Sequence, residues 1–423
     1  MAGEWLDTTL GEVAQELTVG FVGSMAEHYV EEGIPFLRSQ DILPYRIDFS
    51  DIKYISIKFH SKIQKSSLKA GDVVIVRTGK PGTAAVVHDD IGELNCSDLV
   101  IVRPGARLDA QFLCYYINTI AAGHVAAHLV GAVQQHFNVG SAKQLRISLP
   151  PLPIQRQIAA ILSAFDDKIE LNRRMNRTLE QMARALFKSW FVDFDPVRAK
   201  MRGEQPKGMD AETAALFPDR LVEIEEREVP KGWKVKGLDE IAEFLNGLAL
   251  QKFPPTGDND LPIIKIAQLK KGSTDSSSFA SRAVEEKYMV QDGDILFSWS
   301  GSLEVVRWAG GEGALNQHLF KVTSPQYPAW FTYWWLLEHL PDFQTIAASK
   351  ATTMGHIQRK HLNDAKVNVP PEAIISSLAD QIEPIFESMF KNDIKSKRLC
   401  TLRDALLPRL LAGEVDVSGW EKI

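Results

Sequence analysis

The sequence contains no recognisable set of catalytic side chains. The nearest approach to an Asn/Asp-Pro-Pro-Tyr/Phe motif is NVPPEA at 368–373, in which glutamate follows the prolines. GxGxxG and GxxxxGK[ST] loops are absent, and neither Asp219 nor Asp342, each after a proline, is followed by the acidic-x-Lys group of a nuclease. His124 and His128 have no third, acidic ligand nearby, so a surface or packing role is favoured over a metal site. The residues therefore predict no active site, no metal and no cofactor.

Side chains suited to bonding nucleic acid are grouped in short segments of the first half. Lysine and arginine contact phosphates, and glutamine can bond bidentately to an adenine edge. The segments are RSQ at 38–40, the lysine-rich 53–69, VRTGKPG at 76–82 and QQHFN at 134–138. The candidate DNA contacts are Arg38, Ser39, Gln40, Lys58, Lys62, Arg77, Thr78, Lys80, Gln134, Gln135, His136 and Asn138. A solvated cationic surface explains 53–69 equally well, and the glycines of 76–82 equally fit turns.

The second half offers fewer candidates, at matching places. They share polar side chains in segments that align with those of the first half. They are Lys265, Gln268, Lys270, Ser300, Ser302, His356, Gln358 and Arg359. The segments 134–138 and 354–359 are the strongest candidates for contact with DNA.

The two halves of the chain are repeats of one another. GIPFLRSQDI (33–42) aligns with DLPIIKIAQL (260–269), and AGDVVIVRTG (70–79) aligns with DGDILFSWSG (292–301). Further on, LPPLPIQRQIAAIL starting at 149 aligns with VPPEAIISSLADQI starting at 369. An ordered series of matches at an offset of about 220 residues indicates an internal duplication. Each copy is expected to be a mixed α/β domain followed by a helix.

Each copy ends in prolines that are followed by a long helical pattern, from about Ile154 to Trp190 in the first half. Apolar residues at heptad spacing predict a coiled-coil seam. Its first row is Ile158, Phe165, Asn172, Leu179 and Leu186, with Leu378, Ile385, Asn392, Leu399 and Leu406. Its second row is Ile161 or Leu162, then Ile169, Met175, Met182 and Trp190, with Ile382, Met389, Leu402 and Leu410. The alternative is that each helix packs only on its own domain.

Both seams carry one asparagine at the same step, which the alternative does not explain. A lone asparagine in a seam specifies register and orientation. If the helices pair antiparallel, the symmetric register places Asn172 opposite Asn392 at a local two-fold axis. Pro384 is expected to kink the second helix or to break its first turn.

Composition limits the class of protein. The chain has 423 residues, 45% of them hydrophobic, which is enough for two or three cores. A net charge of -6 argues against indiscriminate binding of polyanions but not against a local basic face. Cys96, Cys114 and Cys400 are scattered, as expected in a reducing cytosol. The absence of a signal sequence and of long apolar runs predicts a soluble, cytoplasmic protein.

The doubled organisation, together with LPPLPIQRQIAAIL, ALFKSWFVDFDP and the ending LLPRLLAGEVDVS, resembles the specificity subunits of type I restriction–modification systems. The resemblance covers essentially the whole chain. It implies that each recognition domain reads one half of a bipartite site in double-stranded DNA. It also implies a subunit without an active site that binds two methyltransferase subunits and, in the full complex, restriction and translocase subunits, in a system of phage defence.

The expected fold is α+β, with two pseudo-repeated target-recognition domains separated by two long helices that form an antiparallel coiled coil. The expected boundaries are 1–148 for the first recognition domain, 149–192 for the first spacer helix and 193–229 for a partly ordered linker. The second recognition domain is expected at 230–368, the second spacer helix at 369–412 and a tail at 413–423. Each helix is expected to act as a ruler between two DNA-reading domains.

Two other classes of protein remain as alternatives. One is a methyltransferase fused to its specificity region, which is disfavoured because no segment offers a cofactor-binding fold. The other is a purely structural coiled-coil scaffold, which would leave two large, diverged globular domains without a purpose. Binding of S-adenosylmethionine by the isolated chain separates the first alternative from a DNA reader, and DNA pull-down separates the second.

Overall fold

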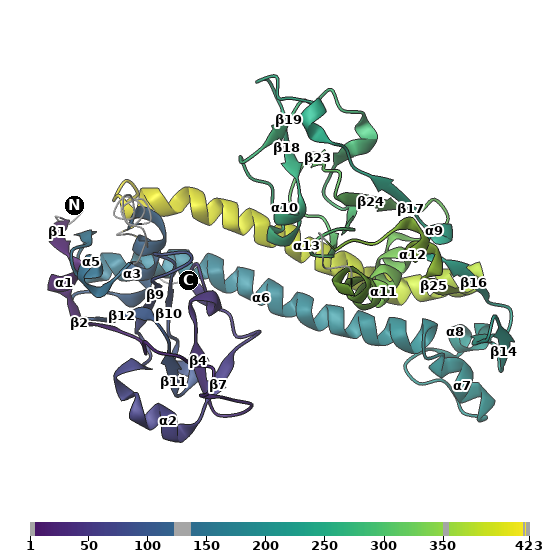
Figure 1. Cartoon of the computed structure of the whole chain (residues 1–423), viewed down its shortest axis with the longest axis horizontal. Helices are drawn as coiled ribbons and strands as arrows, with labels where there is room; N and C mark the ends of the chain where they lie inside the picture. Colours follow the sequence, from purple (N-terminus) through teal and green to yellow (C-terminus); the bar gives the residue numbers. More distant parts are fainter. Residues whose placement is uncertain (1–4, 122–136, 350–354, 418, 420–423) are drawn as a thin grey trace. The chain divides into compact units, whose positions relative to one another are not determined.

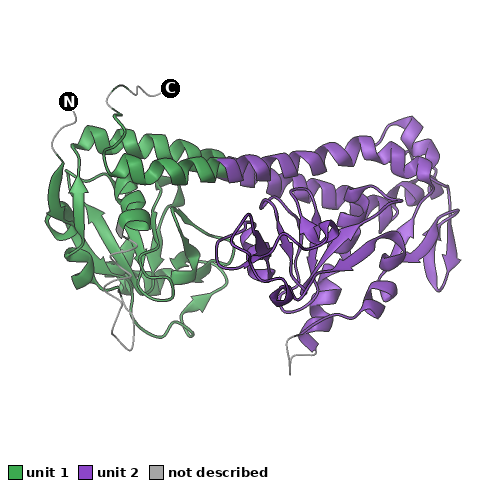
Figure 2. Ribbon diagram, turned by 90° about the horizontal axis from the view of Figure 1, so that it is seen from above, with its two compact units in different colours: residues 1–169, 399–423 green, residues 170–398 purple. Residues whose placement is uncertain are grey.

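The chain folds into two compact units, which a computed structural model describes for residues 5–121, 137–349, 355–417 and 419 (Figure 1). Unit 1 comprises residues 1–169 and 399–423, and unit 2 comprises residues 170–398 (Figure 2). Unit 1 is therefore built from both ends of the chain, whereas unit 2 is continuous in sequence. Each unit includes a part of both long helices.

Unit 1 is built on two sheets. The first has four antiparallel strands in the order β10 (Ala84–Val86), β9 (Val73–Val76), β12 (Leu99–Pro104) and β2 (Ala14–Val19). The second has the order β3 (Tyr29–Val30), β7 (Lys53–Ile55), β4 (Ile34–Leu37), β11 (Leu94–Cys96) and β8 (Ser67–Leu68), with β4 and β11 parallel. The run VVIV of β9 is buried along its whole length, as expected of a strand covered on both faces. β1 (Leu6–Thr9) pairs with β13 (Arg146–Leu149), and β5 (Ile42–Leu43) with β6 (Arg46–Ile47).

Unit 2 repeats this topology strand for strand in its main sheet. The order is β22 (Val305–Arg307), β21 (Ile295–Ser298), β24 (Leu319–Thr323) and β17 (Glu243–Asn246). Its second sheet has the order β19 (Phe279–Ala280), β18 (Leu261–Ile264), β23 (Gly313–Leu315) and β20 (Met289–Val290), and β18 and β23 are again parallel. β16 (Lys234–Gly237) pairs with β25 (Lys366–Val369) as β1 does with β13. The internal duplication is confirmed, together with the mixed α/β content.

Short helices complete both units. In unit 1 they are α1 (Leu10–Val13), α2 (Ile57–Lys62), α3 (Ala110–Tyr116) with a π-helical extension (Ile117–Ala121), and α5 (Val139–Lys143). In unit 2 they are α9 (Leu238–Ile241), α10 (Ile266–Lys271), α11 (Ala329–Ser349) and α12 (Arg359–Asp364). Single 3₁₀ turns occur at Ser39–Asp41, Gln64–Ser66, Asp89–Ile91, Leu250–Lys252 and Glu286–Tyr288.

The stretch 193–229 contains ordered structure. It forms α7 (Asp195–Met201), α8 (Ala211–Leu216) and the hairpin of β14 (Leu221–Ile224) and β15 (Arg227–Pro230). Phe194, Val197 and Phe217 are buried in the core of unit 2, where Phe194 and Phe217 contact the ring of Trp233. These apolar residues anchor the stretch to unit 2, although its overall composition is that of a linker.

Two helices of 40 residues each dominate the fold: α6 (Leu152–Phe191) and α13 (Glu372–Leu411). Each begins directly after a pair of prolines, because a proline cannot continue a helix that precedes it but fits the first turn of a new one. Pro384 lies inside α13 and does not break it, so the expectation of a broken first turn is wrong.

The two helices pair antiparallel, and the first row of the predicted seam lies along the contact. In unit 1, Ile158 and Leu162 share a core with Leu407 and Leu410. In unit 2, Trp190 shares a core with Leu378 and Ile382. The first-row members Ile158, Asn172, Leu378 and Asn392 are buried, and Phe165, Leu179, Leu186, Ile385, Leu399 and Leu406 are half-buried.

Three members of the second row are predicted one residue out of place, whereas Leu162, Ile169, Trp190, Ile382 and Leu410 are buried as expected. Met175, Met182 and Leu402 are exposed, and a strict heptad step from Leu162 instead reaches Asn176 and Ala183. Ala183 is fully buried, and Asn176 bonds across the seam to Met389 O (3.0 Å). The apolar pattern favours Met175 and Met182 because the seam positions beside them carry asparagine and alanine. Similarly, the heptad step on α13 reaches Ser396 and Arg403.

Asn172 and Asn392 do not bond each other, so that prediction is wrong. Asn172 Nδ2 donates to Ser396 Oγ (3.1 Å), and Asn392 Nδ2 donates to Asn176 Oδ1 (2.9 Å). The two rows of a seam are reached by alternating steps of three and four residues along the helix. In an antiparallel partner, these steps come in the reverse order. The first row of one helix therefore faces the second row of the other. Asn176 and Ser396 are themselves repeat mates, so the two bonds are related by a local two-fold axis. That axis passes midway between Asn172 and Asn176, half a helical turn from the position predicted at Asn172.

Among the residues described, no helix is long and apolar enough to cross a membrane. Within these described residues, no three or more His, Cys, Asp or Glu side chains form a group that could hold a metal ion. None of the three cysteines forms a disulfide, and burial raises the pKa of Cys96 and Cys114 above the ordinary value.

Candidate nucleic-acid interface

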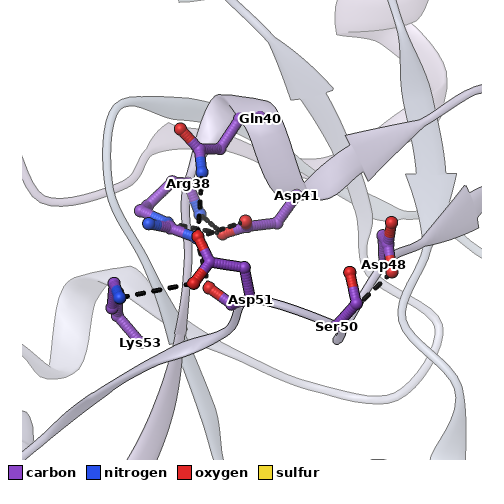
Figure 3. Close-up of polar contacts among 7 residues, drawn as sticks. All are labelled: Arg38, Gln40, Asp41, Asp48, Ser50, Asp51 and Lys53. Atoms are coloured by element: carbon purple, nitrogen blue, oxygen red, sulfur yellow. Dashed lines mark hydrogen bonds and ion pairs between the residues drawn. The ribbon is translucent and has the colours of Figure 1, made fainter. Parts of the chain in front are cut away.

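Arg38 is held by two carboxylates of unit 1. Its Nε and Nη2 donate to the two oxygens of Asp41 (2.9 and 2.7 Å), and Nη2 also lies 3.2 Å from Asp51 Oδ2 (Figure 3). Gln40 and Lys53 approach the same Asp51 carboxylate, at 3.5 and 3.3 Å. The bond to Asp41 raises the pKa of Arg38, and the bond from Arg38 lowers the pKa of Asp51. These side chains mainly fix the segment between β4 and β7, and the Lys53 charge is balanced.

The corresponding segment of unit 2 has the same cap with neutral chemistry. The Lys265 backbone N–H donates to Gln268 Oε1 (3.2 Å), as that of Arg38 does to Asp41 Oδ2 (2.7 Å). Gln268 is buried, and its Nε2 donates to Asp275 (3.0 Å). Lys265 Nζ donates to Ser278 Oγ (2.9 Å), whereas Lys270 is exposed. Gln268 therefore serves the fold.

Lysines on α2 remain available to solvent. Ser56 caps this helix by accepting from the backbone N–H of Phe59 (3.2 Å), which starts the helix at Ile57. Lys58 and Lys62 are exposed one turn apart, and within the described chain neither has an acidic partner within 4 Å. Their ammonium groups suit contact with a phosphate backbone.

A second group lies where two strands of the unit 1 sheet end. Arg77 directly follows β9 and Asp98 directly precedes β12, and the pairing of Leu99 with Val76 sets them side by side. The Arg77 guanidinium forms an ion pair with the Asp98 carboxylate through Nη1. The side chains are 18% and 34% exposed, so the pair lies at the surface but is mostly covered. We refer to these two positions as the strand-end pair.

The strand-end pair of unit 2 is Trp299 and His318. Trp299 follows β21 and His318 precedes β24, with Ser298 paired to Leu319. The two rings lie 5.9 Å apart, and the indole Nε1 donates to Asn246 Oδ1 (2.8 Å). This polar and aromatic group occupies the place that an ion pair occupies in unit 1.

Backbone bonds show that the two strand-end pairs are equivalent. The N–H of Phe137 donates to Arg77 O (3.2 Å), and that of Ile357 donates to Trp299 O (3.0 Å). Each bond brings together two segments whose candidates the sequence predicted separately: 76–82 with 137–138, and the segment of Ser300 and Ser302 with that of His356, Gln358 and Arg359. On the other side, Gly20 N–H donates to Leu99 O (2.8 Å), as Gly247 N–H does to Leu319 O (3.0 Å).

The glycines at this edge are required by crowding. A Cβ on Gly20 would lie 1.6 Å from Ser97 O, and a Cβ on Gly247 would lie 2.2 Å from Asn316 O. No side chain fits at either position. The turns after β9 and β21 also contain Gly79 and Gly301 with φ of 85° and 67°, which favour glycine.

The remaining candidates fall into three groups. Some have structural partners: Asn138 caps α5 through the N–H of Ser141 (2.9 Å), and Ser300 is buried against His318 Nδ1 (3.0 Å). Those at the edge are Thr78, Lys80, Ser302, His356, Gln358 and Arg359, of which Lys80, Gln358 and Arg359 are exposed, whereas Ser39 lies in the turn after β4 beside Arg38. Gln134, Gln135 and His136, like His124 and His128, lie outside the described residues.

Sequence reasoning missed Asp98, Asn246, Trp299 and His318. Each lies directly beside a glycine or at a strand end, within the aligned repeats. The available signal was the alignment itself: Arg77 aligns with Trp299 in the matched segments 70–79 and 292–301. A position that keeps its backbone role and changes its side chain is a candidate for specificity.

Comparison with known proteins shows the family. The family model described as "Type I restriction modification DNA specificity domain" matches residues 3–181 and 230–399, and the chain belongs to this family. The two matches coincide with the two copies of the repeat.

Curated relatives match over all or nearly all of their length. The type I restriction enzyme HindI specificity subunit of Haemophilus influenzae is 26% identical over 97% of this chain and 100% of its own. The MjaIX specificity subunit of Methanocaldococcus jannaschii is 28% identical over 98% and 97%. Among solved structures, the type I restriction–modification S subunit from M. genitalium matches 97% of this chain and 99% of its own, with a TM-score of 0.52 and 15% identity. That likeness supports the fold.

Proposed function

We propose that this chain is the non-catalytic DNA-specificity subunit of a type I restriction–modification complex. Each unit reads one half of a bipartite site in double-stranded DNA. The observation that carries the proposal is one scaffold used twice, with the same strand-end edge carrying an ion pair in unit 1 and an aromatic pair in unit 2. A duplicated reader with two chemistries suits two different half-sites.

The test exchanges one reader. The chain is co-expressed with its methyltransferase subunits, and methylated positions are mapped by sequencing with residues 1–148 either native or taken from another family member. One half of the methylated sequence should change while the other half stays. A change in both halves would show that the units do not read independently. The isolated chain should bind no S-adenosylmethionine.

The long helices set the unread distance between the half-sites. At 1.5 Å per residue, each helix of 40 residues spans about 60 Å, more than one turn of B-DNA (about 34 Å). Inserting four residues after Arg174 and four after Ile394, which are repeat mates at the centre of the pair, lengthens both helices by about 6 Å and keeps both polar layers. The methylated half-sites should then lie one or two base pairs further apart. Insertions of two residues rotate the helix faces by about half a turn and should abolish binding. An unchanged spacing after the four-residue insertions would refute the ruler.

A face of α6 supports docking of a methyltransferase subunit. Leu171, Met175 and Met182 are 46%, 44% and 50% exposed, and their spacing of four and seven residues puts them on one face. Exposed apolar side chains in a row are typical of a surface that a partner helix covers. Met175→Glu together with Met182→Glu should prevent co-purification with the methyltransferase. Leu216→Glu, at an exposed apolar residue of α8, is the matched control and should have no effect.

A further inference from the structure

The strand-end pair differs in kind from its surroundings. The backbone bonds of Phe137 and Ile357, and the crowded glycines Gly20 and Gly247, are the same in both units. The cap between β4 and its following turn is also kept, although one unit uses a carboxylate and the other an amide. These three features of the scaffold have therefore survived the divergence of the repeats, whereas the strand-end pair has changed its chemistry completely.

The Arg77 side chain is oriented in advance for recognition. Asp98 holds Nη1, so the guanidinium plane is fixed before a ligand arrives. Within the described part of the chain, Nη2 has no bonding partner, whereas Nε is buried and cannot reach a base. The donors left for a ligand are therefore those of Nη2 and the second N–H of Nη1. A guanidinium offers parallel N–H donors in one plane, which match the two acceptors O6 and N7 on the major-groove edge of guanine. Fixing the plane lowers the entropy lost when those bonds form.

The pair in unit 2 offers no such donors. The indole N–H of Trp299 is already bonded to Asn246, and the imidazole of His318 lies between Ser300 Oγ (3.0 Å) and Gln317 Nε2 (3.3 Å). Neither side chain presents two parallel free donors. The matching position of the second half-site therefore has a different base requirement.

We propose that the strand-end pair is a specificity-determining position of each unit, and that Arg77, oriented by Asp98, selects a guanine in the half-site read by unit 1. This inference rests on the proposed function. Its structural basis is the pairing of Leu99 with Val76, which fixes the two side chains at one end of the sheet.

The test measures discrimination at single base positions. The complex of this chain with its methyltransferase subunits is assayed on a randomised DNA library, with the parent, Arg77→Ala and Arg77→Lys compared. Preference for guanine at one position of one half-site should fall roughly 5- to 150-fold in Arg77→Ala, the range for one bidentate contact. Arg77→Lys keeps the charge but loses the paired donors, so it should lose preference at that position while retaining more affinity than Arg77→Ala.

The control variant is Arg103→Ala. Arg103 lies at the opposite end of β12 and is paired with Glu16 and Asp72. Its replacement by alanine therefore removes ion pairs from the same sheet. It should leave all base preferences unchanged. If Arg77→Ala does not assemble, Arg77→Lys decides the question through the same position.

The outcomes separate the inference from the function on which it rests. A parent complex without two preferred half-sites overturns the proposed function and this inference together. A parent with two half-sites, combined with unchanged guanine preference in both Arg77 variants, overturns the inference alone. Equal weakening at every position of the half-site also overturns it, because that is the signature of a phosphate contact or of damaged folding.

Discussion

The two units begin their long helices in opposite ways. In unit 1, the fully buried Gln155 donates to Arg107 O (2.9 Å) and Pro150 O (2.8 Å) and accepts from the N–H of Asp109 (2.9 Å). In unit 2, the aligned residue is Ile375, which lines a cavity of about 680 Å³. One junction is tied by hydrogen bonds, and the other rests on apolar packing beside an open cavity.

The difference shows that the repeats diverged in matched steps. Pro328 lines the unit 2 cavity and stands where Asp109 stands in unit 1, directly before α11 as Asp109 is before α3. Proline has no N–H, so a glutamine at Ile375 would lose the donor that Gln155 uses. Unit 2 therefore lacks both the side-chain amide and the backbone N–H that would donate to it, so at this junction the donor and the acceptor are absent together.

The largest expected effect is at Gln155. Gln155→Ile transplants the unit 2 residue into unit 1 and leaves two carbonyls and one N–H buried without partners. We expect the free energy of unfolding to fall by about 3 kcal/mol, since each unsatisfied buried group costs about 1–3 kcal/mol and the site can relax in part. Chemical denaturation of the whole chain measures it. A loss below about 1 kcal/mol would show that the hydrogen bonds do not hold the junction.

The control for Gln155 lies two residues further along α6. Gln157 is half-buried, and its Oε1 has no hydrogen-bond partner within the described chain. Gln157→Met replaces a side-chain amide with an apolar group of similar size and breaks no hydrogen bond within the described chain. Its unfolding free energy should match that of the parent within about 0.5 kcal/mol.

A smaller effect is expected at the two polar layers of the helix pair. Asn392 bonds Asn176, whereas its repeat mate Asn172 bonds Ser396. A double-mutant cycle with Asn176→Leu and Asn392→Leu should give a coupling energy of about 1–2 kcal/mol. The cycle of Asn172→Leu and Asn392→Leu should give below about 0.5 kcal/mol, because these two share no bond. Equal coupling in both cycles would contradict the observed register.

The smallest effect concerns pH and a residue that only unit 2 has. His339 stacks on Trp335, and its Nε2 lies 3.1 Å from Lys366 O, whereas the aligned residue of unit 1 is Ile120. Burial lowers the pKa of His339 below its ordinary value of 6.5. The unfolded chain therefore binds the proton more tightly, so the stability from neutral His339 is present above pH 6.5 and falls as the pH drops below it.

Thermal unfolding at pH 7.5 and pH 5.5 tests this sign. The melting temperature of His339→Phe should fall less on acidification than that of the parent. The surface variant His88→Gln should behave as the parent does, because His88 is exposed. A His339→Phe chain with the parent's full pH dependence would place the titrating group elsewhere.

The duplicated topology and the first row of the seam were predictable because they rest on repeated apolar spacing. The middle of the second row was not, because Asn176 and Arg403 occupy seam positions where the heptad pattern calls for an apolar residue. The role of Arg38 was also hidden: Asp41 is close in sequence, but Asp51 reaches the guanidinium only through the pairing of β4 with β7. Side-chain partners brought together by strand pairing leave no local pattern in the sequence.

The two-segment composition of unit 1 has a consequence for synthesis. Leu407, Leu410, Leu411 and Val417 belong to its core, together with Ile158 and Leu162. Unit 2 is made as one continuous stretch between the two parts of unit 1. At about 5–20 residues per second, the ribosome takes roughly 10–45 s to pass through residues 170–398. Throughout that time the C-terminal residues that cover the apolar face of α6 in unit 1 have not been synthesised. This face therefore stays exposed, and the N-terminal unit is completed last.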